Sequence, residues 1–289
     1  MKSFCIKINN NSILNYLFDR FSLLELDHLY LSFNSFKIYD NVIVHYSGTN
    51  TELFYDCVCN ILTDTILKFY EPILLKKELN SNFFYFSSSE KDRILELCNF
   101  DNSIESEFFK DKYFSIYKSF VKYLREHHSI VLNGFLNFRL GEYRETLDFI
   151  LNTCINRYLI EREYFEFISI LKLYIGSNIS KVSNIHLIFF NNTSILLDDN
   201  KQLIDSKSEE YFNAKFLSDI TFSDNDYILN YLLNTLPAHL TIHLPTNYIE
   251  DDFINTLKLI FEDRITICNN CDVCSIYKHI NSNMKNKNT

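Results

Sequence analysis

The chain has 289 residues and a formal net charge of −9, with 28 lysines and arginines against 37 aspartates and glutamates. This acidic balance opposes general binding to nucleic acids or to anionic membranes, because both depend on a positive field. We therefore expect no nucleic-acid partner. The length suffices to bury a large core in one large domain or two ordinary ones. The patterns below predict an α+β protein with a small β-α-β-β N-terminal part, a helical middle and a C-terminal mixed sheet with covering helices.

The expected cellular context follows from signals that are missing. Residues 1–9 are too short for the apolar core of a signal peptide and run into a polar stretch at 9–12. The longest apolar runs, such as 185–190, fall well short of the roughly 18 to 20 residues that a membrane span needs. We expect a cytoplasmic protein without a membrane span. In a reducing compartment its eight cysteines are free thiols or metal ligands.

The first hundred residues alternate between the two common periodicities. Phe4, Ile6 and Ile8 recur at every second position, as in a half-buried strand, whereas the apolar residues from Ile13 to Phe21 have helical spacing. The expected elements of this part are strands at 3–8, 28–34 and 36–46, and helices at 13–21, from 51 to the interruption at Glu71-Pro72, and around 94–98. Pro72 suits the first turn of a further helix.

The middle of the chain is helical. One helix is expected over 104–127, and the stretch from Gly134 to Gly176 reads as two helices that form a hairpin. Arg144 and Asp148 stand four residues apart there, as do Arg162 and Glu166, close enough to pair on a solvated helix face.

After Gly176 the period changes to two. The expected elements are strands at 185–190, 194–198, 239–244 and 264–268, and helices at 209–217, 224–236 and 248–261. We expect a domain of α/β and helical character at 1–100, a second domain at 101–277 and a flexible polar tail at 278–289.

The order of these pieces resembles the YtxC-like family of sporulation-associated proteins from endospore-forming bacteria. The similarity runs from about Ser129 to Cys274, and its most specific piece is Gly134-Phe135 with Phe138-Arg139-Leu140 and Tyr143. No motif of the first hundred residues contributes to it. The resemblance implies a cytoplasmic protein of unassigned biochemistry and brings no catalytic residues.

From the resemblance we expect a non-enzymatic protein that acts in sporulation through contacts with a protein partner. Phe138, Arg139, Glu142 and Tyr143 are the candidate binding surface, because arginine and tyrosine contribute much of the energy at interfaces. The alternative is that these charges belong to an ordinary solvated helix face.

The sharpest chemical feature is Cys268-Asn-Asn-Cys271-Asp-Val-Cys274, directly after a predicted strand. Cysteines three apart can converge on one ion, as in zinc and iron–sulfur sites. His279 is the nearest candidate for a fourth ligand and would favour zinc, with Cys5 or a partner chain as alternatives. In the alternative interpretation no metal is bound: Cys268 is a buried strand residue, and Cys271 and Cys274 are free thiols of the C-terminal tail. The function alternative to protein contacts is therefore metal binding by the C-terminal cysteines, with zinc or an iron–sulfur cluster as the cofactor and zinc favoured if His279 is the fourth ligand.

Two pairs of histidines are weaker candidates for functional residues. His239 and His243 face the same side of a predicted strand and could serve a metal or acid–base site, although histidines on a wet strand face are far commoner. His127 and His128 lie at a helix end, where a cation favours the helix dipole.

Common catalytic motifs are missing. With only four glycines, the chain contains neither a GxGxxG nor a GxxxxGK phosphate loop. The sequence thus points to no enzyme class.

Overall fold

The computed structural model describes residues 1–100, 107–190, 193–207, 222–245 and 251–285. The chain divides into two compact units, Met1–Glu161 and Arg162–Thr289. Each unit has a hydrophobic core of its own. The expected helix at 209–217 lies outside the described residues, as do the turn at 191–192 and the start of the helix expected at 248.

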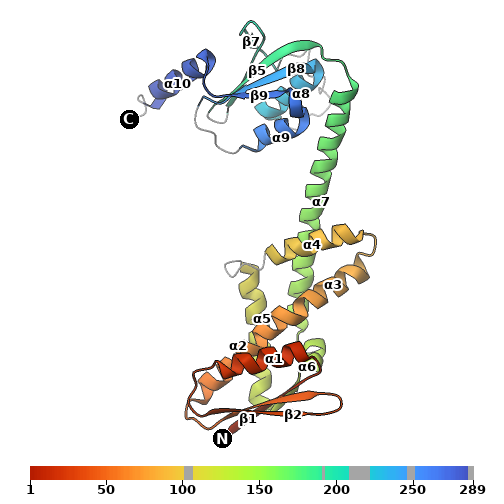
Figure 1. The fold of residues 1–289 in the computed structure, drawn as a ribbon, viewed down its shortest axis with the longest axis vertical. Coiled ribbons are helices and arrows are strands. Elements are labelled where there is room, and N and C mark those ends of the chain that lie inside the picture. Colours follow the sequence, from red (N-terminus) through yellow and green to blue (C-terminus); the bar gives the residue numbers. More distant parts are fainter. Residues whose placement is uncertain (101–106, 191–192, 208–221, 246–250, 286–289) are drawn as a thin grey trace. The chain divides into compact units, whose positions relative to one another are not determined.

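The first unit begins with a four-stranded sheet. Its strand order is β2-β3-β1-β4, with β4 parallel to β1 and the other pairs antiparallel. Helix α1 lies beside this sheet (Figure 1). It buries Ile13, Leu17 and Phe21 in the same core cluster as the apolar residues of β1 and β3. The strands and the helix are β1 (Lys2–Ile8), α1 (Asn11–Ser22), β2 (Leu29–Ser35), β3 (Asp40–Tyr46) and β4 (Ser129–Val131).

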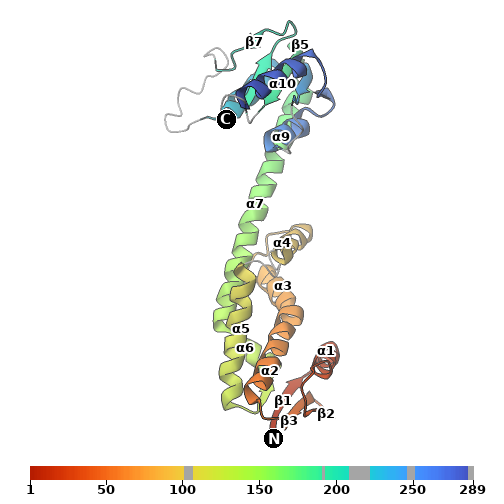
Figure 2. The same ribbon diagram turned by 90° about the vertical axis from the view of Figure 1, so that its left-hand side faces the viewer.

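Helices complete the first unit. The chain passes from α2 to α3 without a break through a π-helical segment, and Pro72 stands in the first turn of α3 as expected. Figure 2 shows these helices with α5 and the first part of α7. The helical elements are α2 (Thr51–Thr65), η1 (Ile66–Tyr70), α3 (Glu71–Asn82), α4 (Ser88–Phe100), α5 (Glu107–Glu126) and α6 (Leu132–Phe138).

The expected helical hairpin between Gly134 and Gly176 is wrong. A short α6 is followed by one continuous helix of 37 residues, α7 (Gly141–Ser177). The reason is local, because no glycine or proline stands between Gly141 and Gly176 to stop the helix. Arg162 and Glu166 pair across one turn, as expected, at 3.4 Å. The boundary between the two units falls inside α7, not near residue 100.

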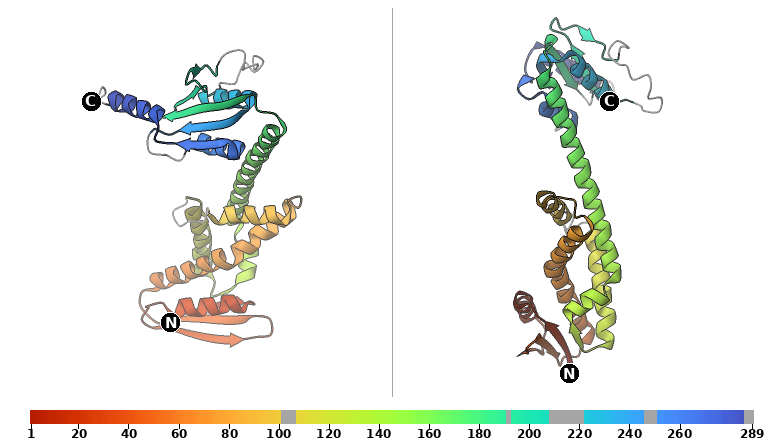
Figure 3. Two further views of the ribbon diagram at one scale, coloured as in Figure 1. Left: turned by 45° about the horizontal axis from the view of Figure 1, so that its top comes forward. Right: turned by 90° about the vertical axis from the view of Figure 1, so that its right-hand side faces the viewer.

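The second unit contains a mixed five-stranded sheet in the order β7-β6-β5-β8-β9 (Figure 3). β5, β8 and β9 are parallel, whereas β6 and β7 are antiparallel to their neighbours. The elements are β5 (Val182–Phe190), β6 (Thr193–Leu197), β7 (Leu203–Ile204), α8 (Asp224–Thr235), β8 (Pro237–His243), α9 (Asp252–Phe261), η2 (Glu262–Arg264), β9 (Ile265–Cys268) and α10 (Asp272–Lys285). Helix α10 occupies residues where we expected the polar tail to begin.

Side-chain alternation gives the second sheet two different faces. Leu240 and Ile242 of β8 join the core cluster with residues of α8, α9 and the second half of α7. His239, Thr241 and His243 must then point to the opposite face, since successive strand residues alternate. The expected α+β class, with a mixed sheet and covering helices in the C-terminal part, is confirmed.

Within the described ranges, no helix combines the length and the apolar character needed to cross a membrane.

Candidate metal centre

The ends of two parallel strands bring a histidine and a cysteine together. β8 ends at His243 and β9 ends at Cys268, and these two residues are register partners. The carboxyl ends of parallel strands lie at the same edge of a sheet, and α9 supplies the crossover that parallel pairing requires. The two side chains therefore lie on the same face of the sheet, away from the apolar cluster.

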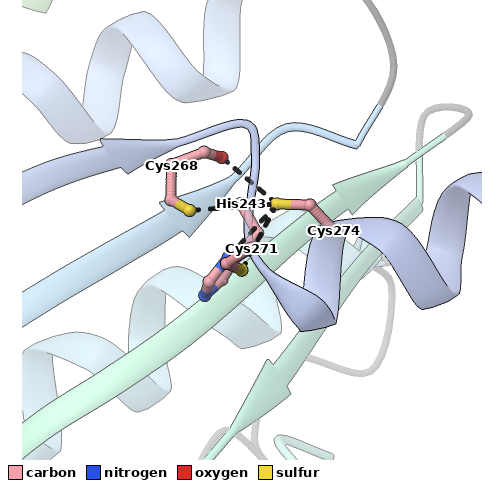
Figure 4. A group of neighbouring side chains, drawn as sticks. All are labelled: His243, Cys268, Cys271 and Cys274. Atoms are coloured by element: carbon pink, nitrogen blue, oxygen red, sulfur yellow. Dashed lines mark hydrogen bonds between the residues drawn. The ribbon is translucent and has the colours of Figure 1, made fainter.

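The chain then turns back so that two further cysteines reach this edge. Cys271 directly precedes α10, and Cys274 lies in its first turn. The Cys271 carbonyl oxygen accepts the first hydrogen bond of the helix, from the Ser275 amide at 2.9 Å. Figure 4 shows the three thiols and the His243 ring pointing toward one another from the two strands and the helix.

The donor atoms of His243, Cys268, Cys271 and Cys274 all lie within 4.8 Å of one another. Cys274 Sγ lies 3.9 Å from Cys268 Sγ and 3.7 Å from Cys271 Sγ. His243 Nδ1 lies 3.4 Å from Cys271 Sγ and 3.5 Å from Cys274 Sγ. Cys274 and His243 are buried, whereas Cys268 and Cys271 are half-buried.

These separations match the edges of a zinc tetrahedron. With Zn–S bonds of about 2.3 Å and Zn–N bonds of about 2.0–2.1 Å, tetrahedral geometry gives S–S edges of about 3.8 Å and S–N edges of about 3.5 Å. The two S–S distances of 3.9 and 3.7 Å and the two S–N distances of 3.4 and 3.5 Å follow this pattern. The other two edges, from Cys268 to Cys271 and to His243, are no longer than 4.8 Å, so the residues form a Cys3His donor set that could hold one ion.

The protonation of the donors follows from their surroundings. Burial, together with the nearby His186 and Lys201, lowers the pKa of His243 to about 4, so the ring is neutral at pH 7 and keeps a lone pair for a metal. Burial raises the pKa of the Cys274 thiol to about 11. Burial also acts to raise the pKa of Cys271, but hydrogen bonds from the backbone of Cys274, the neighbouring thiols and the backbone of Val273 outweigh it, and the pKa is lowered.

A second histidine stands behind the metal donors. His186 Nδ1 lies 2.9 Å from His243 Nε2, on the side of the ring that faces away from the thiols. His186 Nε2 contacts the Lys201 ammonium and lies 2.9 Å from Nδ2 of Asn184. Burial lowers the pKa of His186, and the charge of Lys201 lowers it further. His186 was not among the site residues predicted from the sequence.

The three cysteines predicted as metal ligands converge in the structure. The fourth donor among the described residues is His243. Cys5, an alternative in the prediction, belongs to the other unit. His279 lies in α10, but its side chain is outside the described part of the chain. His239 is exposed and is not among the clustered donors.

A topological signal could have identified His243. Two predicted strands joined by a helix, as at 239–244 and 264–268, form a parallel pair whose ends meet at one edge. His243 is the metal-binding side chain nearest the end of the first predicted strand, so it should then lie close to Cys268 at the end of the second.

The candidate binding surface separates into two groups. Phe138 is 86% exposed, and Arg139 and Glu142 are exposed as well. Tyr143 is fully buried, so it cannot form part of a surface. Its hydroxyl donates to Glu71 at 2.8 Å inside the first unit, because the helical period turns position 143 toward the core.

The fold and this site define an α+β protein with a Cys3His cluster that could hold a metal ion. Comparison with known proteins gives the family: residues 56–266 match the model of the YtxC-like family, and the chain belongs to it. A similar protein is the uncharacterized protein YtxC of Bacillus subtilis (strain 168), which is 24% identical over 220 residues, 69% of this chain and 76% of the relative. No solved structure matches the chain.

The family match differs in range from the resemblance seen in the sequence. It begins at residue 56, well inside the part where we found no motif. It includes His186 and His243 and ends two residues before Cys268.

Proposed function

We propose that the second unit binds one zinc ion through His243 Nδ1 and the thiolates of Cys268, Cys271 and Cys274. The observation that carries the proposal is the agreement of the donor distances with a tetrahedron of this size. Three thiolates and one imidazole are a typical zinc donor set. An iron–sulfur cluster is a weaker fit, because such clusters are usually held by four thiolates.

The proposed zinc is structural. Four protein donors fill a tetrahedral site and leave no position for a substrate or a water molecule, in contrast to catalytic zinc sites. The donors come from the ends of β8 and β9 and from the start of α10. Zinc would therefore fasten the beginning of α10 to the edge of the sheet, and its binding free energy would add to the folding free energy of this unit.

Metal content of the full chain, purified without oxygen, tests this proposal. We expect about one zinc per chain, and a Cys271→Ser/Cys274→Ser variant should lose it. The matched control is Cys5→Ser/Cys57→Ser, which changes two half-buried thiols of the other unit and should leave the zinc content unchanged. Absence of metal from the wild-type chain, or full zinc content in the Cys271/Cys274 variant, would overturn the proposal.

A second candidate function is contact with a protein partner during sporulation in the cytoplasm, as the family resemblance suggests. The observation that favours it is a cavity of about 490 Å³ at the family-specific residues of the first unit. Its volume lies in the range of known ligand sites. The cavity is lined by Lys118, Ser119, Lys122, Tyr123, Glu126, His127, Phe135, Phe138, Arg139, Gly141 and Glu142.

The charges of this cavity suggest the kind of partner. Lys118, Lys122 and Arg139 have no ionic partner among the described residues, and Phe138 stands exposed beside them. The carboxylates of Glu126 and Glu142 line the cavity too, so the excess of positive charge is small. We propose a protein segment that combines carboxylates with an apolar side chain, since such a segment would pair the cations and cover Phe138.

A complementation experiment tests this second function. In an endospore-forming bacterium that lacks its family gene, the wild-type chain should restore spore formation, whereas Lys118→Glu/Lys122→Glu/Arg139→Glu should not. The charge-matched control, Lys37→Glu/Lys76→Glu/Lys77→Glu, changes three exposed lysines elsewhere in the unit and should restore it. Equal complementation by both variants, at equal protein levels, would rule out this surface.

A further inference from the structure

The two ring nitrogens of His243 face in opposite directions, one toward the proposed metal site and one away from it. Its Nδ1 faces the thiols at 3.4 and 3.5 Å, and its Nε2 lies 2.9 Å from His186 Nδ1. His243 is 3% and His186 is 7% exposed, so water has little access to the contact between the two rings. Any proton between them must be shared by these two nitrogens.

The sheet places His186 for this contact. β5 and β8 are parallel, and His186 is the register partner of Thr241, two positions before His243. Positions two apart on a strand point to the same face, so the two histidines lie on the face that carries the metal donors. The arrangement is thus set by the backbone pairing of central strands, not by a loop.

Metal binding decides which nitrogen of His243 carries the proton. A nitrogen that donates its lone pair to a metal cannot hold a hydrogen, so a neutral His243 bound through Nδ1 is protonated at Nε2. That buried N–H requires an acceptor, and His186 Nδ1 stands at hydrogen-bond distance. We propose that His186 is the positioning residue of the metal centre, holding His243 in the tautomer and ring orientation that bind metal; the inference rests on the zinc site proposed above.

The contacts of His186 should also change when the metal binds. If His186 accepts at Nδ1, its own proton is at Nε2, beside Lys201 and Asn184. The Lys201 ammonium has no lone pair to accept this proton, but the Asn184 carboxamide can turn its oxygen toward it. The hydroxyl of Thr241, now 3.3 Å from that oxygen as a donor, can accept from the turned amide. Metal binding should therefore move the Lys201 ammonium away from His186 Nε2. Because Lys201 lies in the turn between β6 and β7, the conformation of this turn should change as well.

Zinc affinity of the full chain, measured by competition with a chromophoric chelator, tests the inference. We expect His186→Ala to bind zinc about 10- to 100-fold more weakly, the usual effect of removing such a partner of a ligand. His186→Gln should recover part of the loss, because its side-chain oxygen can accept from His243 Nε2. The control His239→Ala removes an exposed histidine of the same strand face and should leave the affinity unchanged.

Two spectroscopic readouts separate positioning from a general effect on stability. The cobalt-loaded His186→Ala chain should show an altered ligand-field spectrum, since the imidazole ligand is no longer held in place. In the zinc-loaded wild-type chain labelled with ¹⁵N-histidine, His186 should be unprotonated at Nδ1 and protonated at Nε2. The labelling experiment needs no variant and stays decisive if His186→Ala does not fold.

The outcomes distinguish failure of the role of His186 from failure of the zinc site on which it rests. A wild-type chain without metal refutes the zinc site itself. A wild-type chain that holds zinc on the four donors, while His186→Ala binds equally well with an unchanged cobalt spectrum, refutes only the role of His186. A proton on His186 Nδ1 in the loaded protein would refute that role as well.

Discussion

Lys112 and Glu71 form an ion pair inside the core of the first unit, with 2.6 Å between Nζ and Oε1. The side chains are 1% and 3% exposed, and the Tyr143 hydroxyl donates to the other carboxylate oxygen of Glu71 at 2.8 Å. The contact joins α3, α5 and α7 at one point. Charges this deeply buried persist only when they are paired and hydrogen-bonded.

Replacing only one member of this pair should be costly. We expect Lys112→Met to lower the free energy of unfolding by about 3–5 kcal/mol, because it leaves the Glu71 charge buried without its counter-ion. Urea unfolding measures the change. The surface pair of Arg20 and Asp64, at 3.6 Å and partly exposed, provides the control: Arg20→Met should cost less than about 1 kcal/mol.

Neutralising both charges should cost less than removing one. In Glu71→Gln/Lys112→Met, the glutamine oxygen can still accept from Tyr143, and no charge stays in the core. A double variant less stable than Lys112→Met would contradict the view that the unpaired charge causes the loss.

A proline inside α7 tests whether this helix is continuous. Glu163 is exposed and lies where the sequence had suggested a hairpin. Glu163→Pro should destabilise the protein by about 3 kcal/mol or more, since proline removes a helix hydrogen bond and clashes with the preceding turn. Glu163→Ala removes the same side chain without these effects and should change stability little. Equal stability of the two variants, with unchanged circular dichroism, would indicate a turn at this position.

Buried and half-buried tyrosines predict a loss of stability at alkaline pH. Burial raises the pKa of Tyr70 and of Tyr113 to about 12 and also raises the pKa of Tyr143. In the unfolded chain a tyrosine ionises near pH 10, so the unfolded state releases protons first. The stabilisation is complete below about pH 10 and declines as pH rises toward 12.

Urea midpoints between about pH 8 and pH 11 measure this decline. Tyr70→Phe, which cannot ionise, should make the decline shallower, whereas the same change at the exposed Tyr85 should not. An identical pH dependence in wild type and Tyr70→Phe would show that Tyr70 does not contribute.

Three histidine variants identify the fourth metal donor. His243→Ala should lose most of the zinc affinity, because the ring supplies one of four donors. His239→Ala and His279→Ala should retain it, since four donors already complete the tetrahedron. Loss of zinc from His279→Ala, with retention in His243→Ala, would assign the fourth position to the C-terminal helix.

Much of the fold could be predicted because most elements follow a regular period. The alternation of Phe4, Ile6 and Ile8 corresponds to β1, and the helical spacing from Ile13 to Phe21 corresponds to α1. The final strand was expected at 264–268 and is β9 (Ile265–Cys268). Such periods are local, since they reflect which side of a single element meets the core.

The failures concern how the elements are joined and where the ends of the chain become ordered. Periodicity in α7 is compatible with one helix or two, and only the lack of a helix stop distinguishes them. A flexible tail was expected from residue 278 because the sequence is polar there, whereas helix α10 continues to Lys285. The sequence-based domain boundary near residue 100 ignored the packing of α5 and the first half of α7 into the N-terminal core.

The sequence by itself determined the class of the fold, the spacing of the three cysteines and the membership of residues 134–143 in a family pattern. Tertiary structure decided which side chains meet. It brought His243 to Cys268 across 25 positions through the pairing of parallel strands, and placed His186 against the other nitrogen of His243. It also removed Tyr143 from the surface by burying it against Glu71. The physical reason is that strand register and core packing bring together residues distant in sequence, and neither is encoded in a local pattern.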